Sequence, residues 1–390
     1  MEYSVIIIGG GAAGMMASAT IGRGALLLEK NSRLGVKVGI TGNGRCNITN
    51  DCDVEGLIEK TLRNPYFLYS AFYAFPPSDV IALFNDLGVA TKVEVGGKVF
   101  PVSDKSSDVI DALSRHIREQ GAELRLNSDV TCITKDDDGV FCVELSDGKV
   151  FRANKVILAT GGLSYPNTGS TGAGFKFARG FGHTVAATQP TLAPLVCTEP
   201  WIESLMGVSL SRVELTARGF RGVGDVIFTH YGISGPLAIT ASAYIGGGKI
   251  TLNLAPDLDL LAEFNKNTNR DIKNTLGSIL TKAIIPVILQ LAGIPADKKV
   301  NSITKEERTR LITQIKGLTL TVAGNRGYKE AVITAGGVCV DEIDPSTMQS
   351  KLVEGLYFAG EMIDVHALTG GYNLQIAFST GYLAGLSTKL

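Results

Sequence analysis

The 390-residue sequence predicts an α/β fold that is interrupted by an inserted β-rich region, with a helical segment nested inside that region. Three observations predict this arrangement. A buried apolar run leads into a glycine-rich turn near the N-terminus, and an alternating β-meander returns to a second buried run over 155–159. A third short strand with its own glycine turn follows over 355–361. The stretch between the second and third strands differs in composition and periodicity, which indicates an insertion.

The N-terminal turn has the spacing of a dinucleotide-binding element. The apolar run Ser4–Ile8 is typical of a parallel strand buried on both faces. It ends in Gly9, Gly11 and Gly14, which match G-x-G-x-x-G. The first glycine allows a sharp turn, the second lets the backbone approach a pyrophosphate, and the third brings the following helix close to the strand.

The residues after this turn complete the pattern. A small-residue helix is expected over 12–21, and its N-terminus would offer free N–H groups to phosphates. A second apolar run over 25–28 ends in Glu29, where a carboxylate can accept hydrogen bonds from ribose hydroxyls. Strand, turn, helix and acid together predict a Rossmann-like domain, although the opening alone does not distinguish FAD from NAD.

Two later segments favour FAD. The loop over 31–50 is rich in glycine and carries Arg33, Lys37 and Arg45, as expected of a loop that folds back along a pyrophosphate and a flavin edge. The meander over 130–153 leads to the strand that ends in Ala159, Thr160, Gly161 and Gly162, a tight turn whose amides can approach FAD. A flexible surface loop and an ordinary strand-to-loop turn are the alternative interpretations of these segments.

The C-terminal segment is expected to close the cofactor site. Gly360 and Glu361 end the strand over 355–361, and Asp364 is a second acid there. Gly370 and Gly371 then open a helix through residue 386. Such a helix N-terminus would place partial positive charge where a reduced flavin carries negative charge. A terminal helix that only stabilises the fold is the alternative.

The insertion predicts further domains. We expect an FAD-binding domain in two segments, 1–187 and 333–390, and a β-barrel-like insert of 188–256 and 317–332. Residues 257–316 are expected to form a nested helical insert, where Thr304 and Glu307 have the spacing of a capping box.

Composition limits the classes of function. The chain has 37 basic and 38 acidic residues, a net charge of −1, so we expect neither a nucleic-acid nor a membrane partner. Its six cysteines form no C-x-x-C pair, so we expect no metal site and no disulfide framework. Together with the absence of an export signal, this predicts a cytoplasmic enzyme with a small-molecule substrate. The sequence leaves the oligomeric state open.

Five blocks of this sequence resemble the BaiN/RdsA-type family of NAD(P)/FAD-dependent oxidoreductases. They are SVIIIGGGAAG, KVGITGNGRCNITN, ATGGLSYPNTGSTGAG, FTHYGISGP and the segment from TAGGVCV through GGYNLQIAFSTG. The resemblance covers the whole chain. It implies bound FAD and the three-part fold, and some relatives reduce conjugated double bonds in steroid-like enones. Asn43 stands where many relatives have a smaller residue, which we expect to be tolerated if this position adopts a positive φ.

These patterns predict the following cofactor contacts: Gly9, Gly11, Ala12, Ala13, Gly14, Glu29, Lys30, Lys37, Thr41, Gly42, Asn43, Gly44, Arg45, Cys46, Asn47, Val130, Thr160, Gly161, Gly162, Gly360, Glu361, Asp364, Gly370, Gly371, Tyr372 and Asn373.

The expected reaction is hydride transfer between flavin N5 and a carbon of an organic substrate. Tyr372, His366 and Tyr165 are the candidate proton donors, and Arg45 could hold a carbonyl or stabilise an enolate. A second G-x-G-x-x-G is missing from the sequence, so NAD(P)H is expected to dock transiently in the substrate cleft. A flavin oxidase and a non-catalytic FAD-binding protein remain alternatives, and the near-zero charge counts against an RNA-modifying flavoenzyme.

Overall fold

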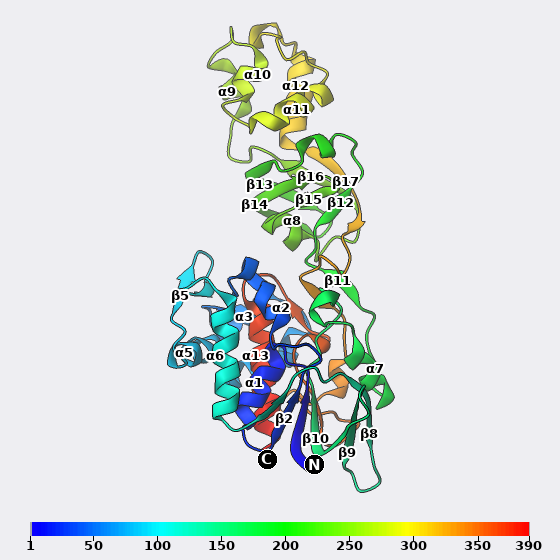
Figure 1. Ribbon diagram of the computed structural model, residues 1–390. Coiled ribbons are helices and arrows are strands. Elements are labelled where there is room, and N and C mark those ends of the chain that lie inside the picture. The colour runs from blue at the N-terminus through cyan, green and yellow to red at the C-terminus, as the bar shows by residue number, and fades with distance from the viewer. Residues whose placement is uncertain (1, 390) are drawn as a thin grey trace. The chain divides into compact units, whose positions relative to one another are not determined.

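The computed structural model describes residues 2–389, which form two compact units (Figure 1). Unit 1 consists of residues 2–190 and 332–389, and unit 2 of residues 191–331. Unit 1 contains a mainly parallel sheet with helices, and unit 2 contains a closed six-stranded barrel with a group of helices between its last two strands in chain order. The predicted fold class is therefore confirmed. The exact domain boundaries, and the separation of the barrel from the helical segment, stay predictions.

Unit 1 is built on a seven-stranded sheet. Its strands, in spatial order, are β7 (Glu123–Arg125), β2 (Ala25–Leu28), β1 (Glu2–Ile8), β10 (Val150–Leu158), β9 (Phe141–Leu145) and β8 (Val130–Lys135), with β19 (Leu356–Phe358) pairing with β10. Pairing is parallel for β7–β2, β2–β1, β1–β10 and β10–β19, and antiparallel for β10–β9 and β9–β8. The two short runs expected over 149–153 and 155–159 form one continuous strand, β10. Its first half pairs with β9, and from Arg152 onward it pairs with β1.

The helices of unit 1 are α1 (Ala12–Ile21), α2 (Val36–Ile40), α3 (Val54–Lys60), α4 (Tyr69–Ala74), α5 (Pro77–Asp86), α6 (Ser106–Glu119), α7 (Ala173–Gly180) and α13 (Tyr372–Ser387). The first and last of these pack directly on each other (Figure 1). A Cβ on Gly381 of α13 would lie 2.3 Å from the Ala13 carbonyl oxygen, and one on Gly385 would lie 2.9 Å from that of Ala17. Glycine is therefore required for this close helix contact.

The remaining strands of unit 1 form three small sheets: β3 (Thr49–Asn50), β5 (Thr91–Glu94) and β6 (Lys98–Pro101); β4 (Thr61–Arg63) with β20 (His366–Ala367); and β11 (Gln189–Thr191) with β18 (Ile333–Ala335). Its short 3₁₀ turns are η1 (Thr41–Gly44), η2 (Pro65–Leu68), η3 (Pro166–Thr168), η7 (Val340–Glu342) and η8 (Gly360–Met362).

Unit 2 has its own hydrophobic core. Its barrel closes in the order β12 (Leu195–Cys197), β15 (Gly232–Ser234), β14 (Phe220–Thr229), β13 (Ser209–Ala217), β16 (Gly248–Asn253) and β17 (Leu318–Asn325). Its helices and turns are η4 (Ile202–Leu205), α8 (Pro236–Ala241), α9 (Leu260–Asn265), α10 (Ile272–Leu276), η5 (Lys282–Ile284), α11 (Ile285–Ala292), η6 (Val300–Ser302) and α12 (Lys305–Lys316). The capping box predicted from Thr304 and Glu307 is confirmed at the start of α12.

One stretch of the described chain, Pro65–Asp86, is apolar and long enough to be considered as a membrane span. It is not one continuous helix. Phe75 has φ −150° and ψ 79°, which separates α4 from α5. At 1.5 Å per residue, neither helix is long enough to cross a hydrocarbon core of about 30 Å.

Candidate functional site

A pocket lies where the carboxyl ends of the central parallel strands meet. The chain leaves β1 at Gly9, β2 at Glu29, β10 at Ala159 and β19 at Ala359, and all four residues line the pocket. The first residues of α1 and of α13 complete its wall. In an open α/β sheet this edge is the usual place for a ligand.

The three glycines of the first turn have different surroundings. A Cβ on Gly9, which has φ +106°, would lie 2.5 Å from the Ala159 carbonyl oxygen, and one on Gly14 would lie 1.9 Å from that of Gly9. Both glycines are therefore needed for packing. A Cβ on Gly11 would meet no protein atom within 4 Å. Gly11 lines the pocket, so the open space beside it is available to a ligand.

The N-terminus of α1 suits an anion. Its N-cap residue, Gly11, provides no side-chain hydrogen bond, and the first turn contains no acidic residue. The N–H groups of this turn therefore remain available, and the helix dipole adds partial positive charge at the same place. A pyrophosphate fits these donors, which is the fit expected for a dinucleotide cofactor.

Glu29 is buried just after β2, and its carboxylate accepts hydrogen bonds from two backbone amides beside the pocket. Its Oε2 accepts a hydrogen bond of 2.6 Å from the Gly10 amide, and its Oε1 accepts one of 2.8 Å from the Asn31 amide. A carboxylate oxygen can accept more than one hydrogen bond, so both oxygens keep capacity for a ribose hydroxyl. That contact stays a prediction.

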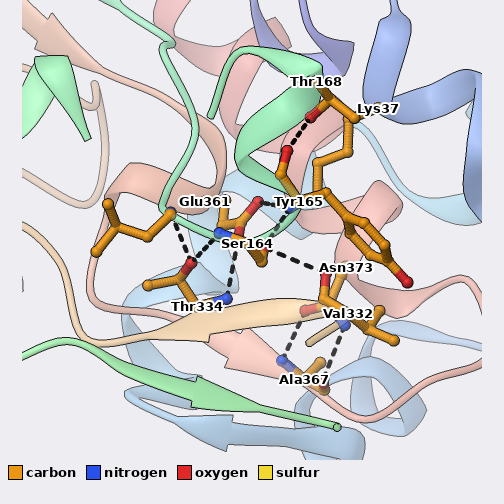
Figure 2. A network of polar contacts seen from close by, with 10 residues as sticks. Lys37, Ser164, Tyr165, Thr168, Val332, Thr334, Glu361, Ala367 and Asn373 are labelled. Carbon is orange, nitrogen blue, oxygen red and sulfur yellow. Dashed lines mark hydrogen bonds and ion pairs between the residues drawn. The ribbon is translucent and has the colours of Figure 1, made fainter. Parts of the chain in front are cut away.

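A polar network joins four distant segments at the pocket wall (Figure 2). Lys37 Nζ donates to Glu361 Oε2 and to the Ser164 hydroxyl, each at 2.5 Å. Glu361 Oε1 accepts from the Ser164 hydroxyl at 2.7 Å and from the Thr334 amide at 2.9 Å. The Thr334 hydroxyl in turn accepts from the amides of Leu163 and Ser164. Lys37 and Glu361 line the pocket, so this network places a paired positive and negative charge in its wall.

The pair Gly370 and Gly371 packs on the protein rather than lining the pocket. Gly371 has φ +99°, and a Cβ there would lie 2.2 Å from the Thr49 carbonyl oxygen. Asn50 Nδ2 donates to the Gly370 carbonyl at 3.0 Å. Asn373, in the first turn of α13, does line the pocket, and its side chain exchanges two hydrogen bonds with the Ala367 backbone (Figure 2).

The loop after α2 reaches the pocket only through Thr41. Asn43 has φ 58°, so the condition under which we expected asparagine to be tolerated at this position is met. Cys46 is completely buried, which raises the pKa of its thiol to about 12. The Arg45 guanidinium pairs with Glu94 and Asp104 and lies 4.0 Å over the Phe100 ring. These contacts with β5, β6 and the turn after β6 already engage Arg45.

The structure thus divides the predicted site residues into two groups. Those that line the pocket are Gly9, Gly11, Ala12, Ala13, Glu29, Lys30, Lys37, Thr41, Val130, Thr160, Gly161, Gly360, Glu361 and Asn373. Those outside its lining are Gly14, Gly42, Asn43, Gly44, Arg45, Cys46, Asn47, Gly162, Asp364, Gly370, Gly371, Tyr372, Tyr165 and His366. No proposed proton donor lies in the pocket wall.

Sequence reasoning did not single out several pocket residues. Asn31, Asp129 and Ser170 line the pocket, and Ser164 and Thr334 hold its charged pair. Asn31 lies two residues after Glu29, so the hydrogen bond from its amide to that carboxylate is a local contact that the sequence could have suggested. Thr334 gave no comparable pattern, because its role depends on a contact 27 residues away along the chain.

His366 lies in β20, close to Asp364. Arg63 donates to Asp364 Oδ2 through Nε at 3.0 Å and Nη2 at 2.9 Å. Both His366 Nδ1 and Asp364 Oδ1 are buried, and neither has a hydrogen-bond partner among residues 2–389. Buried polar atoms of this kind are normally satisfied by a ligand or by water.

This burial predicts a lower stability at acidic pH. Burial lowers the pKa of His366, and the Asp364 carboxylate acts in the opposite direction. Neutral His366 therefore contributes stability that is complete above its unfolded pKa of about 6.5 and is lost as pH falls through the lower folded pKa. We expect the Tm of the His366→Leu variant to fall less steeply between pH 7 and pH 5 than that of the parent chain. The variant His230→Gln, at an exposed histidine, serves as the control, and equal slopes in His366→Leu and the parent would contradict the prediction.

The sheet, the glycine turn and the pocket at the strand ends define a dinucleotide-binding fold of the flavoprotein class. The chain belongs to the family described as HI0933-like protein Rossmann domain, whose sequence model matches residues 3–387.

Three similar proteins extend this assignment. The chain is 34% identical to the ribosomal RNA dihydrouridine synthase of Escherichia coli, over 98% of this chain and 96% of that protein. It is 31% identical to the 3-dehydro-bile acid delta(4,6)-reductase of Clostridium scindens, over 97% of each chain. A flavocytochrome c3 fumarate reductase has a similar fold, with a TM-score of 0.50, 17% identity, and coverage of 99% of this chain and 78% of that one. The protein is therefore an enzyme, an FAD-dependent oxidoreductase.

Proposed function

We propose that this enzyme reduces a carbon–carbon double bond conjugated to a carbonyl group, with NAD(P)H as the electron donor. The observation that carries the proposal is the pair of relatives above 30% identity over nearly the whole chain. One is named for reducing a bile acid and the other for making dihydrouridine. The two substrates differ greatly in size, but an oxo-steroid enone and the uracil ring both contain an alkene conjugated to a carbonyl.

The residues of unit 1 support the binding half of this proposal. The α1 N-terminus and Gly11 would hold the pyrophosphate of FAD, and Glu29 would accept hydrogen bonds from a ribose. Lys37 and Glu361 would flank the same molecule as a neutralised pair. Bound FAD would supply the hydride-transfer chemistry. The sequence contains one G-x-G-x-x-G, which supports a transient docking of NAD(P)H rather than a second nucleotide-binding domain.

The test is anaerobic reduction of the purified yellow protein by NADH and, separately, by NADPH. We expect one nicotinamide to bleach the flavin absorbance within seconds, and an acceptor with a conjugated enone to restore it. Failure of both nicotinamides would overturn the proposal. Rapid reoxidation in air with release of peroxide, without reaction with the enone, would favour the oxidase alternative. Bleaching by either nicotinamide also rules out a non-catalytic FAD-binding protein.

A uridine in RNA is the second candidate substrate. The expectation of no nucleic-acid partner relied on the net charge of the whole chain, and this charge is unevenly distributed. Residues 191–331 contain 16 lysines and arginines against 12 aspartates and glutamates, a net charge of +4. The rest of the chain therefore carries −5. A 3-oxo-4-ene steroid and a uridine-containing RNA, offered separately to the reduced enzyme, distinguish the two acceptors.

A further inference from the structure

A hollow on the barrel surface is lined by positively charged side chains, an aromatic ring and several glycines. It is lined by the turn between β13 and β14, by the segment that enters β16, and by Tyr244. The lining residues that matter here are Arg218, Gly219, Tyr244, Gly246, Gly248 and Lys249. The hollow lies entirely within unit 2 and is separate from the cofactor pocket of unit 1.

Lys249 lies on β16, and Arg218 lies in the turn directly after β13, the strand that pairs with β16. Strand β13 pairs with β16 in a register that sets Leu215 against Leu252 and Thr216 against Thr251. Continued past the end of β13 into the turn, this antiparallel register brings Arg218 level with Lys249, and both residues line the hollow. Like charges in opposed positions destabilise a sheet. Stability of the barrel therefore gives no reason for this pair.

Neither cation is neutralised by the protein. Among the described residues, Arg218 and Lys249 form no ion pair, although the neighbouring Arg221 pairs with Glu214. The described lining of the hollow contains no aspartate or glutamate. Both cationic side chains are exposed and free to meet an external anion. Two adjacent unpaired cations in a concave site are the usual electrostatic feature of phosphate recognition.

The walls of the hollow leave the backbone accessible. A Cβ on Gly219, Gly246 or Gly248 would meet no atom within 4 Å, so open space lies beside each glycine. Gly219 has φ +78° and Gly248 has φ +102°, values that L-residues rarely adopt. These glycines allow tight turns, and their lack of side chains leaves room for a ligand beside the backbone.

Tyr244 provides a surface for stacking. Its side chain is 43% exposed, and one face of its ring lies against Phe220, with ring centroids 5.2 Å apart and an interplanar angle of 32°. The contact with Phe220 fixes the ring, which leaves the exposed part available to a planar group. Aromatic rings next to cations are typical of sites that bind unpaired nucleotides.

We propose that this hollow binds one nucleotide, with its phosphate between Arg218 and Lys249 and its base stacked on Tyr244. Two sources carry this chemistry: a single-stranded RNA, and a free dinucleotide such as NADPH. The choice of these sources rests on the proposed function. The existence of the binding site does not rest on that function, because nucleotide binding is measured without turnover.

The experiment uses the full-length, FAD-loaded protein and a fluorescein-labelled oligouridylate. The double variant Arg218→Gln/Lys249→Gln is expected to bind the oligonucleotide roughly tenfold more weakly at low salt. The slope of log affinity against log salt should decrease by about 1.4, since each lost contact with a single strand contributes about 0.7. Tyr244→Ala should weaken binding about tenfold, and Tyr244→Phe should retain it.

A matched control removes the same charge elsewhere in unit 2. Lys282 and Lys305 are exposed and form no ion pair among the described residues, so Lys282→Gln/Lys305→Gln changes the net charge equally. Equal losses in the two double variants would mean general attraction and would overturn the site. The proposed site would also be overturned if the Arg218→Gln/Lys249→Gln variant bound both the oligonucleotide and NADPH with unchanged affinity.

The source of the nucleotide follows from a parallel titration with NADPH. Weaker oligonucleotide binding with unchanged NADPH binding assigns the hollow to RNA, and the reverse assigns it to the dinucleotide. Inorganic pyrophosphate as competitor measures the phosphate part alone. If the enone and uridine assays fail while these binding losses appear, the proposed reaction is wrong and the nucleotide site stands. If turnover succeeds but binding is unaffected, only the site is wrong.

Discussion

Replacing Gly11 by alanine is expected to remove FAD from the protein without unfolding it. Gly11 has φ −78°, which alanine adopts freely, and the added methyl group would meet no protein atom within 4 Å. The methyl group would occupy the open space beside the first turn of α1, where the pyrophosphate is proposed to lie. We expect the FAD dissociation constant to rise roughly 10- to 100-fold, as for other overpacked contacts. Fluorescence titration of the apoprotein with FAD measures this change.

Gly14→Ala is the matched control at the same turn. Its Cβ would lie 1.9 Å from the Gly9 carbonyl oxygen, so β1 and α1 must move apart. We expect this variant to lose about 2 kcal/mol or more of apoprotein stability. The Tm of Gly11→Ala apoprotein should instead stay within about 2 °C of the parent value. Unchanged FAD affinity in Gly11→Ala would show that the pyrophosphate lies elsewhere.

Glu361→Ala is expected to destabilise unit 1 even without cofactor. The substitution removes the partner of the Lys37 ammonium and leaves the Thr334 amide and the Ser164 hydroxyl without their acceptor. Breaking a fully buried pair costs about 3–5 kcal/mol. Lys37 is 22% exposed and water can reach it, so we expect a smaller loss of about 2–3 kcal/mol. Urea unfolding of the apoprotein measures the difference.

Two further variants separate charge from hydrogen bonding in this network. Glu361→Gln keeps an oxygen for the Thr334 amide and removes only the charge, so it should lose less stability than Glu361→Ala. Lys37→Met with Glu361→Gln removes both charges and should recover part of the loss seen for Lys37→Met alone. Additive losses in this double variant would contradict a direct interaction between the two side chains.

The local parts of the fold were predictable from the sequence. The predicted helix over 12–21 and strand over 25–28 have the observed bounds, because the glycine turn and the apolar runs are continuous in the chain. The capping box at Thr304 was predictable for the same reason, since its partner lies three residues away. Patterns of this kind depend only on near neighbours.

The rest of the site depends on contacts between distant segments. Gly370 and Gly371 were expected beside the cofactor. Glycine is needed at position 371, however, because a Cβ there would collide with the carbonyl oxygen of Thr49 in β3. Arg45 was a candidate for binding a substrate carbonyl, but Glu94 and Asp104, which lie 49 and 59 residues further along the chain, already engage its guanidinium. A sequence shows that a glycine or an arginine is present, and only the folded chain shows which group it contacts.

The tight contact of α13 with α1 also constrains when the enzyme can acquire its cofactor during synthesis. The ribosome makes α1 early and α13 only after the whole of residues 191–331. Domains tend to fold as units in the order of their synthesis, so unit 2 can fold while unit 1 still lacks a wall of its pocket. Retention of FAD by the nascent chain must therefore wait for its last helix, and ribosome-bound chains halted before residue 372 should be colourless.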